Sequence, residues 1–360
     1  ANEAEAEDRY SYERPAWFAA VAREARAVRE SAGLFELTSY GKYRFRGPKA
    51  EAFLDRILAN RIPQKKGKSA LSPMLSPKGR VIGDFTVTRL DDGDFLLLGS
   101  GSMEKIHERW FLEQLPETGL RYDNLTQRYA GLHVAGPKAR AILEAIAPGV
   151  SFDSADFPFL SGREMELAAC PQALVIRVSY TGEQGFEIYM PMEYQRGLFE
   201  EIMTVGEPYD LKLAGGHALM SLRLEKGFAG WGMELTSDYF PHETALARFV
   251  RYEKEGFIGR EAAIAARNEG SREVYVQFEV AAGEADAYGG EPVYLGDRLV
   301  GYTSSGGFGF SADKSLALGY LFPDDIDMEA TYRIDVVGRM VEARLLPEPP
   351  IDPDGSRMRG

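Results

Sequence analysis

The chain is poor in the residues that build cysteine- and histidine-based sites. Its 360 residues include one cysteine, Cys170, and four scattered histidines, His107, His133, His217 and His242. One cysteine cannot form an intramolecular disulfide, and the histidines lack the spacing of metal ligands. We therefore expect no metal site, interpret Cys170 as a small structural residue, and expect the protein in a reducing cytoplasm.

Long apolar runs and an excess of positive charge are also missing. No stretch approaches eighteen consecutive apolar residues, so we expect no transmembrane helix. The net charge of −13 argues against nucleic acid and anionic membranes as partners, since both require clustered cations. The acidic start, 1–8, has the pattern of neither a secretory signal nor a mitochondrial presequence. An anionic small ligand stays possible where local basic residues meet it.

Several motifs of common enzymes are absent as well. The chain has no Gly-x-Ser-x-Gly, no Cys–His nucleophile setting and no His-Glu-x-x-His, which removes the usual hydrolases and zinc enzymes. Gly99 to Ser102 follows a buried strand and opens a helix, but it lacks the third glycine of a dinucleotide fingerprint and any Gly-Lys-Ser/Thr. We interpret it as a ligand-facing turn. The other glycine-rich run, Ser305 to Phe310, is expected to be a bulged loop.

What the chain does contain is an internal duplication. Tyr43 to Leu54 matches Leu132 to Leu143, and each segment is a strand, a Gly-Pro break and an amphipathic helix. Two strands and a helix follow in each copy: 80–90, 95–98 and 102–115 in the first, and 173–180, 186–190 and 192–203 in the second. We expect two helix-backed antiparallel units that pack with pseudo-twofold symmetry and enclose one cleft.

The remaining segments complete an α+β fold of three domains. Helices are expected over 15–33, 215–227 and 259–268, before a strand-rich section. Short strands at 274–280, 292–295, 299–304, 315–321 and 330–337 predict a small β-barrel, with Gly296-Asp297 as a hairpin turn. The expected domains are 1–130, 131–269 and 270–360. The proline-containing tail from Pro347 is expected to be loosely ordered.

Two carboxylates stand out in apolar strands. Alternation places Asp84 on one face with Thr86 and away from Phe85, and it places Glu187 on one face with Tyr189. An acid in such a strand is commonly a solvated edge or capping residue. If both faces line the cleft between the units, a partly desolvated carboxylate becomes a base or a cation-stabilising group.

Two residues beyond the second copy have alternative interpretations. Arg223 lies near a helix end, where it either balances the helix dipole or clamps a carboxylate through two hydrogen bonds. Trp231 lies in a loop between two glycines, which suits either a plug of the core or a wall against which a ring stacks.

Together these segments resemble the tetrahydrofolate-binding aminomethyltransferase family, whose type member is the T-protein of the glycine cleavage system. The resemblance runs from about Gly33 to about Leu346 and rests on Gly33 to Thr38, the two Gly-Pro helix entries, Val81 to Phe85, Tyr180 to Glu183, Gly185 to Ile188, Arg223 to Glu225, Phe257 to Glu261 and Gly301 to Ser304. Further segments resemble the folate-binding C-terminal portion of dimethylglycine and sarcosine dehydrogenases: Glu13 to Phe18, Ser76 to Val81, Leu222 to Lys226 and Lys314 to Ala317. Those enzymes join a flavin domain to this module, whereas this sequence has no dinucleotide fingerprint.

The resemblance implies a three-domain cloverleaf with tetrahydrofolate at its centre. It implies that Asp84 is catalytic: it would orient and deprotonate the folate amine and stabilise a cationic carbon donor. It also implies that Glu187 holds the N–H groups of the pterin. The other implied folate contacts are Tyr180 and Trp231 along the ring system, Arg223 at the glutamate tail, Tyr40 and Ser100.

The implied function is transfer of a one-carbon unit from an N-methylated amine, or from its iminium, to tetrahydrofolate. Alternatives are S- or O-demethylation, a folate-binding subunit or module of a flavin-dependent dimethylglycine or sarcosine oxidase, and a non-catalytic accessory protein of the iron–sulfur repair type. The implied partners are a small-molecule methyl donor and a flavoprotein. Two residues depart from the family pattern. Gly83 replaces an acid that often precedes the catalytic aspartate, and Tyr40 stands where glycine-cleavage enzymes tend to have Met.

Overall fold

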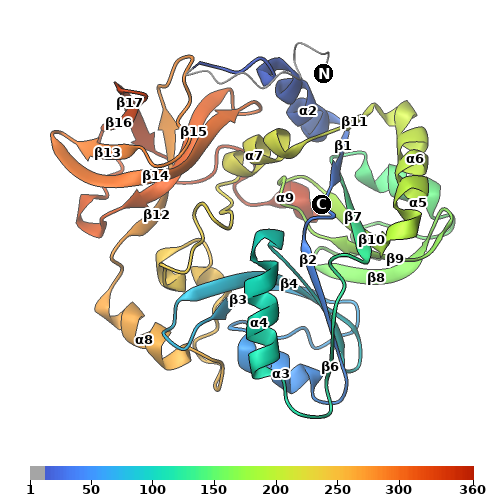
Figure 1. Ribbon diagram of the computed structural model, residues 1–360. Helices are drawn as coiled ribbons and strands as arrows, with labels where there is room; N and C mark the ends of the chain where they lie inside the picture. The colour runs from blue at the N-terminus through green and yellow to red at the C-terminus, as the bar shows by residue number, and fades with distance from the viewer. Residues whose placement is uncertain (1–12) are drawn as a thin grey trace.

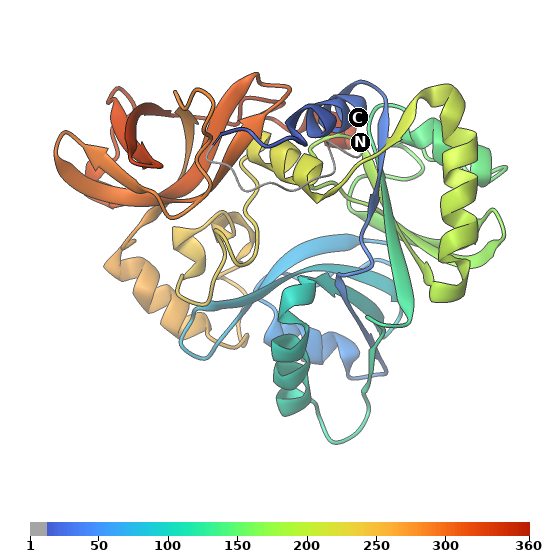
Figure 2. The ribbon, with the colours of Figure 1, turned by 45° about the horizontal axis from the view of Figure 1, so that its top comes forward.

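The computed structural model describes residues 13–360 as three units arranged around a common centre (Figures 1 and 2). The acidic start at 1–8 lies outside the described residues. Two of the units are sheets with helices on one face, and the third is a closed six-stranded β-barrel. The predicted α+β fold, with two helix-backed sheets and a C-terminal barrel, is therefore confirmed.

The first sheet has the strand order β3-β4-β5-β2-β6, and all neighbours in it are antiparallel. Its strands are β2 (Gly41–Arg46), β3 (Ser69–Leu75), β4 (Val81–Asp91), β5 (Asp94–Gly99) and β6 (Arg121–Asn124). Helices α3 (Ala50–Ile57) and α4 (Glu104–Gln114) cover one face, where Phe53 and Phe111 join a core with Tyr43, Phe45 and Phe85. These aromatic residues alternate with others along β2 and β4, so one face of each strand belongs to this core.

The second sheet has the order β11-β1-β7-β10-β9-β8. Its strands are β1 (Ala32–Glu36), β7 (Tyr129–Ala135), β8 (Ser161–Leu167), β9 (Cys170–Arg177), β10 (Gly185–Pro191) and β11 (Leu211–Leu213). Helices α5 (Ala139–Ile146) and α6 (Gln195–Gly206) cover one face, where Ile142 and Ile202 pack with Leu132 and Ile188. The two helix-backed sheets thus repeat one design, as the duplication predicted.

The start of the chain belongs to the second sheet and not to the first. Helix α2 (Phe18–Glu30) ends before the predicted stop at Gly33, because the residues around that glycine form β1 between β7 and β11. Leu34 enters the core of the second sheet. A Cβ at Gly33 would overlap with Val28 of α2, so the helix packs directly onto the strand. The first unit, predicted as 1–130, therefore gives its opening helix and strand to its neighbour.

The third unit begins after two helices, α7 (Gly216–Glu225) and α8 (Arg260–Glu269). Its barrel runs β12 (Val274–Val280), β15 (Lys314–Leu321), β14 (Arg298–Gly309), β13 (Pro292–Leu295), β16 (Tyr332–Val336) and β17 (Arg339–Leu345). The predicted Gly296-Asp297 hairpin joins β13 to β14. The run Ser305 to Phe310, predicted as a loop, continues β14 to Gly309 after a register shift that begins at Thr303. Strand β17 was not predicted.

The tail is ordered, contrary to the prediction. It ends in a short helix, α9 (Ser356–Arg359), and ion pairs hold it against the second unit. Arg357 Nη1 lies 2.9 Å from Glu183 Oε1, and Lys226 Nζ lies 3.2 Å from Asp352 Oδ2. The side chains of Lys226 and Asp352 are each only 3% exposed. Because paired charges removed from water require a fixed geometry, these contacts order a segment whose composition predicted disorder.

The two sheets face each other through the sides that the helices leave uncovered. The contact is an apolar cluster made of Leu90, Leu96 and Leu98 from the first sheet and Leu174, Ile176, Val178 and Tyr189 from the second. We call these two facing surfaces the inter-sheet faces. Because the surroundings are mostly apolar, a carboxylate on either face is separated from water and its charged form is disfavoured.

Candidate functional site

Asp84 lies on the inter-sheet face of β4. Its neighbour Phe85 belongs to the core under the helices, so alternation directs Asp84 to the opposite face with Thr86, which pairs with Leu98. The side chain is half-buried, and burial raises the pKa of Asp84 to about 6. A carboxyl group with this pKa exchanges its proton near neutral pH, as general acid–base chemistry requires.

Glu187 lies on the inter-sheet face of β10 and is 7% exposed. Phe186 and Ile188, its neighbours in the strand, are fully buried on the other face, in the core under α5 and α6. The Tyr189 hydroxyl donates a hydrogen bond of 2.9 Å to Glu187 Oε2. Burial raises the pKa of Glu187 to about 7, although the bond from Tyr189 favours the ionised form. The expected split between the two faces of this strand is therefore what the structure has.

Tyr40 lies in the turn between β1 and β2, near both carboxylates. The pKa of its half-buried phenol is raised above the usual range, first by burial and then by the charges of Glu187, Tyr180 and Asp84. Since such influences fall with distance, the phenol lies within reach of all three groups. The structure thus brings Tyr40, Asp84, Tyr180 and Glu187 together from both units.

Ser100 directly follows the last residue of β5, Gly99, which pairs with Phe85 of β4. A Cβ on the preceding residue, Gly99, would lie 3.3 Å from the Asp84 carbonyl oxygen, which places this strand end beside Asp84. The next residue, Gly101, touches the carbonyl oxygen of Ser39 so closely that no side chain fits there. The predicted ligand-facing turn therefore supports the turn that carries Tyr40.

Tyr180 lies in the loop after β9, not at the end of a strand as predicted. The strand ends at Arg177. The hydroxyls of Ser179 and Thr181 are 3.1 Å apart and hydrogen-bonded to each other, and such local side-chain bonds compete with a sheet ladder. The Tyr180 hydroxyl donates a 2.9 Å hydrogen bond to the Ala229 carbonyl oxygen. This bond ties the loop to the segment that follows α7.

Arg223 is fully buried in α7 and has a partner within the chain. Its Nη1 donates to Glu234 Oε2 over 3.0 Å and to the Phe228 carbonyl oxygen over 3.1 Å. Glu234 also accepts bonds from the Ser305 hydroxyl, over 2.5 Å, and from the Gly230 amide, over 2.7 Å. The guanidinium therefore clamps a carboxylate of the protein itself. A contact between Arg223 and the glutamate tail of folate stays a prediction.

Trp231 is half-buried and packs as a plug. Its ring joins an apolar cluster with Leu75, Val81 and Leu235. Leu75 is the last residue of β3 and Val81 is the first residue of β4, the strand that carries Asp84. Of the two interpretations of this tryptophan, the packing corresponds to the first. A contact with a bound ring stays a prediction.

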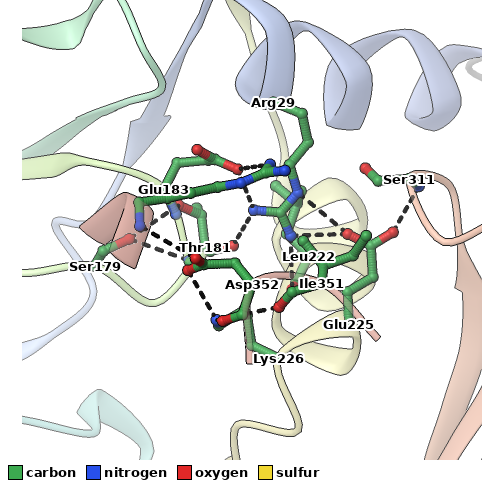
Figure 3. A network of polar contacts seen from close by, with 12 residues as sticks. Arg29, Ser179, Thr181, Glu183, Leu222, Glu225, Lys226, Ser311, Ile351 and Asp352 are labelled. Carbon is green, nitrogen blue, oxygen red and sulfur yellow. Dashed lines mark hydrogen bonds and ion pairs between the residues drawn. The ribbon is translucent and has the colours of Figure 1, made fainter. Parts of the chain in front are cut away.

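A network of buried charges connects α2 and α7 to the loop after β9, which contains Tyr180 and which we call the Tyr180 loop (Figure 3). Arg29 of α2 donates to the Thr181 carbonyl oxygen over 2.7 Å, to Glu183 Oε1 over 2.9 Å and to Glu225 Oε2 of α7 over 2.8 Å. We call these four residues the Arg29 network. Because breaking such a buried pair leaves an uncompensated charge, the network sets the position of the loop relative to α7.

Packing explains why the residue before Asp84 is a glycine, Gly83. A Cβ at Gly83 would lie 2.8 Å from His107 Nε2 and 2.9 Å from the Phe85 ring. His107 has no exposed surface, and burial lowers its pKa to about 4, so its imidazole is neutral at pH 7. A buried neutral ring therefore occupies the space that an acid at position 83 would need, on the face of β4 away from Asp84.

Sequence reasoning missed Lys42. Its side chain is 1% exposed, and its Nζ donates to the Thr38 carbonyl oxygen over 2.8 Å and to the Tyr40 carbonyl oxygen over 2.9 Å. In the sequence, Lys42 and Arg44 are the neighbours of Tyr43 on either side, so strand alternation places both cations on the same face of β2. No sequence signal separates the buried cation from the half-exposed one.

Two further findings concern the part of the chain that the structure describes. No group of three or more His, Cys, Asp or Glu side chains there is close enough together to hold a metal ion. Over the same residues, 13–360, none of the helices has both the length and the apolar character needed to cross a bilayer.

Comparison with known proteins places this site in a family. Residues 1–254 match the GCVT N-terminal domain, and residues 274–352 match the glycine cleavage T-protein C-terminal barrel domain. The dimethylglycine dehydrogenase of Mus musculus is 34% identical over 98% of this chain, which spans 40% of that protein's length. The aminomethyltransferase of Thermoanaerobacter sp. (strain X514) is 32% identical, with 85% of this chain and 83% of the relative covered.

A solved structure agrees with these matches. The glycine cleavage system aminomethyltransferase T from Bartonella henselae superimposes with a TM-score of 0.83 and 26% sequence identity, covering 92% of this chain and 90% of that one. The two matched domains correspond to the paired sheets and to the barrel described above. The chain therefore belongs to the glycine cleavage T-protein family.

Proposed function

We propose that this chain is a tetrahydrofolate-dependent transferase, which moves a one-carbon unit from an N-methylated amine, or from its iminium, to tetrahydrofolate. One observation carries the proposal. Asp84 and Glu187, from the two duplicated units, lie on the inter-sheet faces within electrostatic reach of the same phenol, Tyr40. Two carboxyl groups that titrate near neutral pH in an apolar setting are typical of an acid–base site.

The residues present fit a folate. Ionised Glu187 only accepts hydrogen bonds, which matches the amino and ring N–H donors of a pterin. Its 7% exposure keeps water from competing for those bonds. The half-buried rings of Tyr40 and Tyr180 offer flat apolar surfaces against which a ring system could pack.

Asp84 would perform the proton chemistry. When bound, tetrahydrofolate supplies the amine nitrogen that accepts the one-carbon unit. Ionised Asp84 would accept the proton that this amine loses, and its negative charge would stabilise the positive charge of an iminium or methylated donor held beside it. Because the pKa of Asp84 is about 6, most of the protein has this base ready at pH 7.

A second candidate follows from the extent of the match. The chain covers about two fifths of the length of the dimethylglycine dehydrogenases of mouse, rat and human. It would then perform the folate step on an iminium that a separate flavoprotein, or a flavin-containing segment, makes from dimethylglycine. In that case the chain alone has no turnover with dimethylglycine and gains it when a dimethylglycine-oxidising flavoprotein is added.

The test is a tetrahydrofolate-dependent turnover screen. The donors are dimethylglycine, sarcosine, betaine, dimethylsulfoniopropionate and methoxyaromatics, each with and without the flavoprotein, and Asp84→Asn is the control. We expect product from an N-methylated amine and its loss in the variant. If only the sulfonium or methoxy compounds gave product, the N-methylated amine would be the wrong donor class, and the transferase would instead be an S- or O-demethylase. No product from any donor, together with no tetrahydrofolate binding by calorimetry, would refute the proposal.

A further inference from the structure

We propose that Lys42 and Tyr189 are positioning residues, which together hold Tyr40 and Glu187 at a fixed distance from each other across the site. The inference rests on the proposed function, because it concerns the same folate site. Neither residue belongs to the set that the sequence or the family resemblance assigned to the site.

The first link is the buried ammonium group of Lys42. Two of its three N–H bonds point to the carbonyl oxygens of Thr38 and Tyr40, at 2.8 and 2.9 Å. It therefore closes the turn between β1 and β2 and fixes the backbone of Tyr40. Burial lowers the pKa of Lys42 to about 8, so the group is still mostly charged at pH 7.

The second link is the ring of Tyr189. The Lys42 ammonium lies 6.0 Å from the centre of this ring, at the outer limit of a cation–π contact. The hydroxyl at the other end of the ring donates to Glu187 Oε2 over 2.9 Å. A Cβ at Gly131 would lie 3.0 Å from Tyr189 Cε1, so the neighbouring strand leaves room for the ring only because it has a glycine there.

Packing alone does not hold these two side chains. Both line a cavity of about 150 Å³ between the sheets, together with Leu96, Leu125 and Leu174. A side chain beside empty space keeps alternative rotamers unless polar contacts select one. The bonds to the Tyr40 turn and to Glu187 provide that selection.

The protonation of Glu187 gives the inference a direct readout. The groups that face it are Tyr189 on its own strand, Tyr40 from the turn and His133, its register partner on β7. Burial raises the pKa of both phenols above their usual range and lowers the pKa of His133 to about 4. Of these four groups, Glu187 is therefore the one that titrates between pH 5 and 9. Lys42, whose pKa is about 8, also loses its charge in the upper part of this range, so each variant is compared with the wild type at the same pH.

The first experiment needs no folate. Infrared spectroscopy follows the band of the protonated Glu187 carboxyl against pH, and the band is assigned by its loss in Glu187→Gln. In Tyr189→Phe the stabilising hydroxyl is gone and the ring stays, so we expect the midpoint to rise by about one pH unit. Tyr129→Phe, which removes a hydroxyl from the same cavity, is the matched control and should titrate like the wild type.

The second experiment is calorimetric titration with tetrahydrofolate. At pH 7, Tyr189→Phe should bind about fivefold more weakly than the wild type, because a pKa one unit higher leaves about a fifth as much ionised Glu187. At pH 9 it should bind like the wild type at that pH, because Glu187 is ionised in both proteins. Lys42→Met should bind more weakly at every pH, because it loosens the Tyr40 turn and does not act through protonation. Lys42→Arg, which keeps the charge, should restore part of the affinity.

The outcomes separate this inference from the proposed function. An unchanged Glu187 midpoint in Tyr189→Phe overturns the inference even if tetrahydrofolate binds normally. A shifted midpoint in a protein that binds no tetrahydrofolate supports the link between Tyr189 and Glu187 and refutes the folate function. Melting curves of each variant identify a loss of fold, and Tyr189→Phe keeps the test decisive if Lys42→Met does not fold.

Discussion

Asp84 and Glu187 are both separated from water, yet their surroundings favour different tasks. A tyrosine hydroxyl fixes one oxygen of Glu187, and the carboxyl lies in a strand paired on both sides. Asp84 is less buried, in a strand that is likewise paired on both sides, and no side-chain hydrogen bond within the described residues fixes its carboxyl group. A fixed carboxylate is suited to holding a ligand, whereas a more accessible one can give and receive protons. We therefore expect Glu187 to govern affinity and Asp84 to govern rate.

The first prediction concerns the rate. Asp84→Asn should lower kcat by about 10² to 10⁴, the usual contribution of a general base, and should change tetrahydrofolate affinity little. In the wild type, kcat should rise with pH through about 6, since the ionised form is active and burial raises the pKa of Asp84 to about that value. Steady-state rates from pH 5 to 8 test this. A variant with full activity would remove the catalytic role.

The second prediction concerns stability at the same residue. Burial raises the pKa of Asp84 from its ordinary 3.8 to about 6, so the folded state favours the protonated form. The resulting stabilisation is fully present below about pH 4 and is lost as the pH rises through 6. Asp84→Asn carries no charge at this position at any pH. The melting temperature of the variant minus that of the wild type should therefore increase from pH 4 to pH 8. A difference that does not grow with pH would contradict the proposed burial.

Sequence reasoning at this scale predicts strand faces but not partners. Alternation correctly separated Glu187 from Phe186, because a strand has only two faces. It could not predict that Arg223 meets Glu234, since the glutamate lies in a loop and no periodicity connects a loop to a helix. It also could not identify Lys42 as buried, because residues of the second sheet that lie beside it, Leu174 and Tyr189, come much later in the chain.

At the scale of elements, the turns at the ends of β1 and β5 support each other. Gly101, after β5, touches the Ser39 carbonyl oxygen in the Tyr40 turn. Gly101→Ala should therefore push this turn away, with weaker tetrahydrofolate binding and a lower melting temperature. Gly197→Ala is the matched control, because a Cβ there meets nothing within 4 Å and lies in α6. It should stabilise the protein by about 0.4–1 kcal/mol.

A result in which both glycine variants bind and melt alike would show that the contact between the two turns is dispensable. Calorimetry gives the affinity, and a thermal scan gives the melting temperature. Because Gly197→Ala is expected to gain stability, the close approach at Ser39 is measured by the loss of affinity and melting temperature in Gly101→Ala relative to the wild type.

The elements themselves were largely predictable, and their ends were less so. Helices α4, α6 and α8 lie where the apolar periodicity placed them, since each buries one side and exposes the other. Helix α7 also lies where predicted, although its last turn, 221–225, is buried on all sides. Strand β9 ends earlier than predicted, because Ser179 and Thr181 satisfy each other in the loop. Strand β1 was missed, because its apolar residues continue the pattern of α2 and only its distant partners make it a strand.

At the scale of the whole molecule, the Arg29 network joins the start of the described chain to α7 and to the loop of the second unit. Arg29→Met should leave Glu225, which is 0% exposed, without its cation, and should leave Glu183, which is 3% exposed, with Arg357 alone. We expect the free energy of unfolding to fall by about 3–5 kcal/mol. Urea titration followed by tryptophan fluorescence measures the loss.

The matched control for the network is Arg196→Ala. Arg196 pairs with Glu200 on the surface of α6, and its side chain is 89% exposed. Such a pair contributes about 0.3–0.5 kcal/mol, so this variant should unfold almost like the wild type. Equal losses in both variants would mean that burial adds nothing to the Arg29 pairs.

The pairing of β1 with two distant strands has a consequence for the order in which the molecule assembles. All strands of the first sheet lie between Gly41 and Asn124, so this sheet can form early from local contacts. Strand β1 must wait for β7 and for β11, which ends at Leu213. The strands that cover Leu90, Leu96 and Leu98 of the first sheet, β9 and β10, also come later in the chain, and until they dock these leucines remain uncovered and prone to aggregation. The docking that finally protects them also brings Asp84 and Glu187 onto facing surfaces, so we expect a half-assembled chain to bind no tetrahydrofolate.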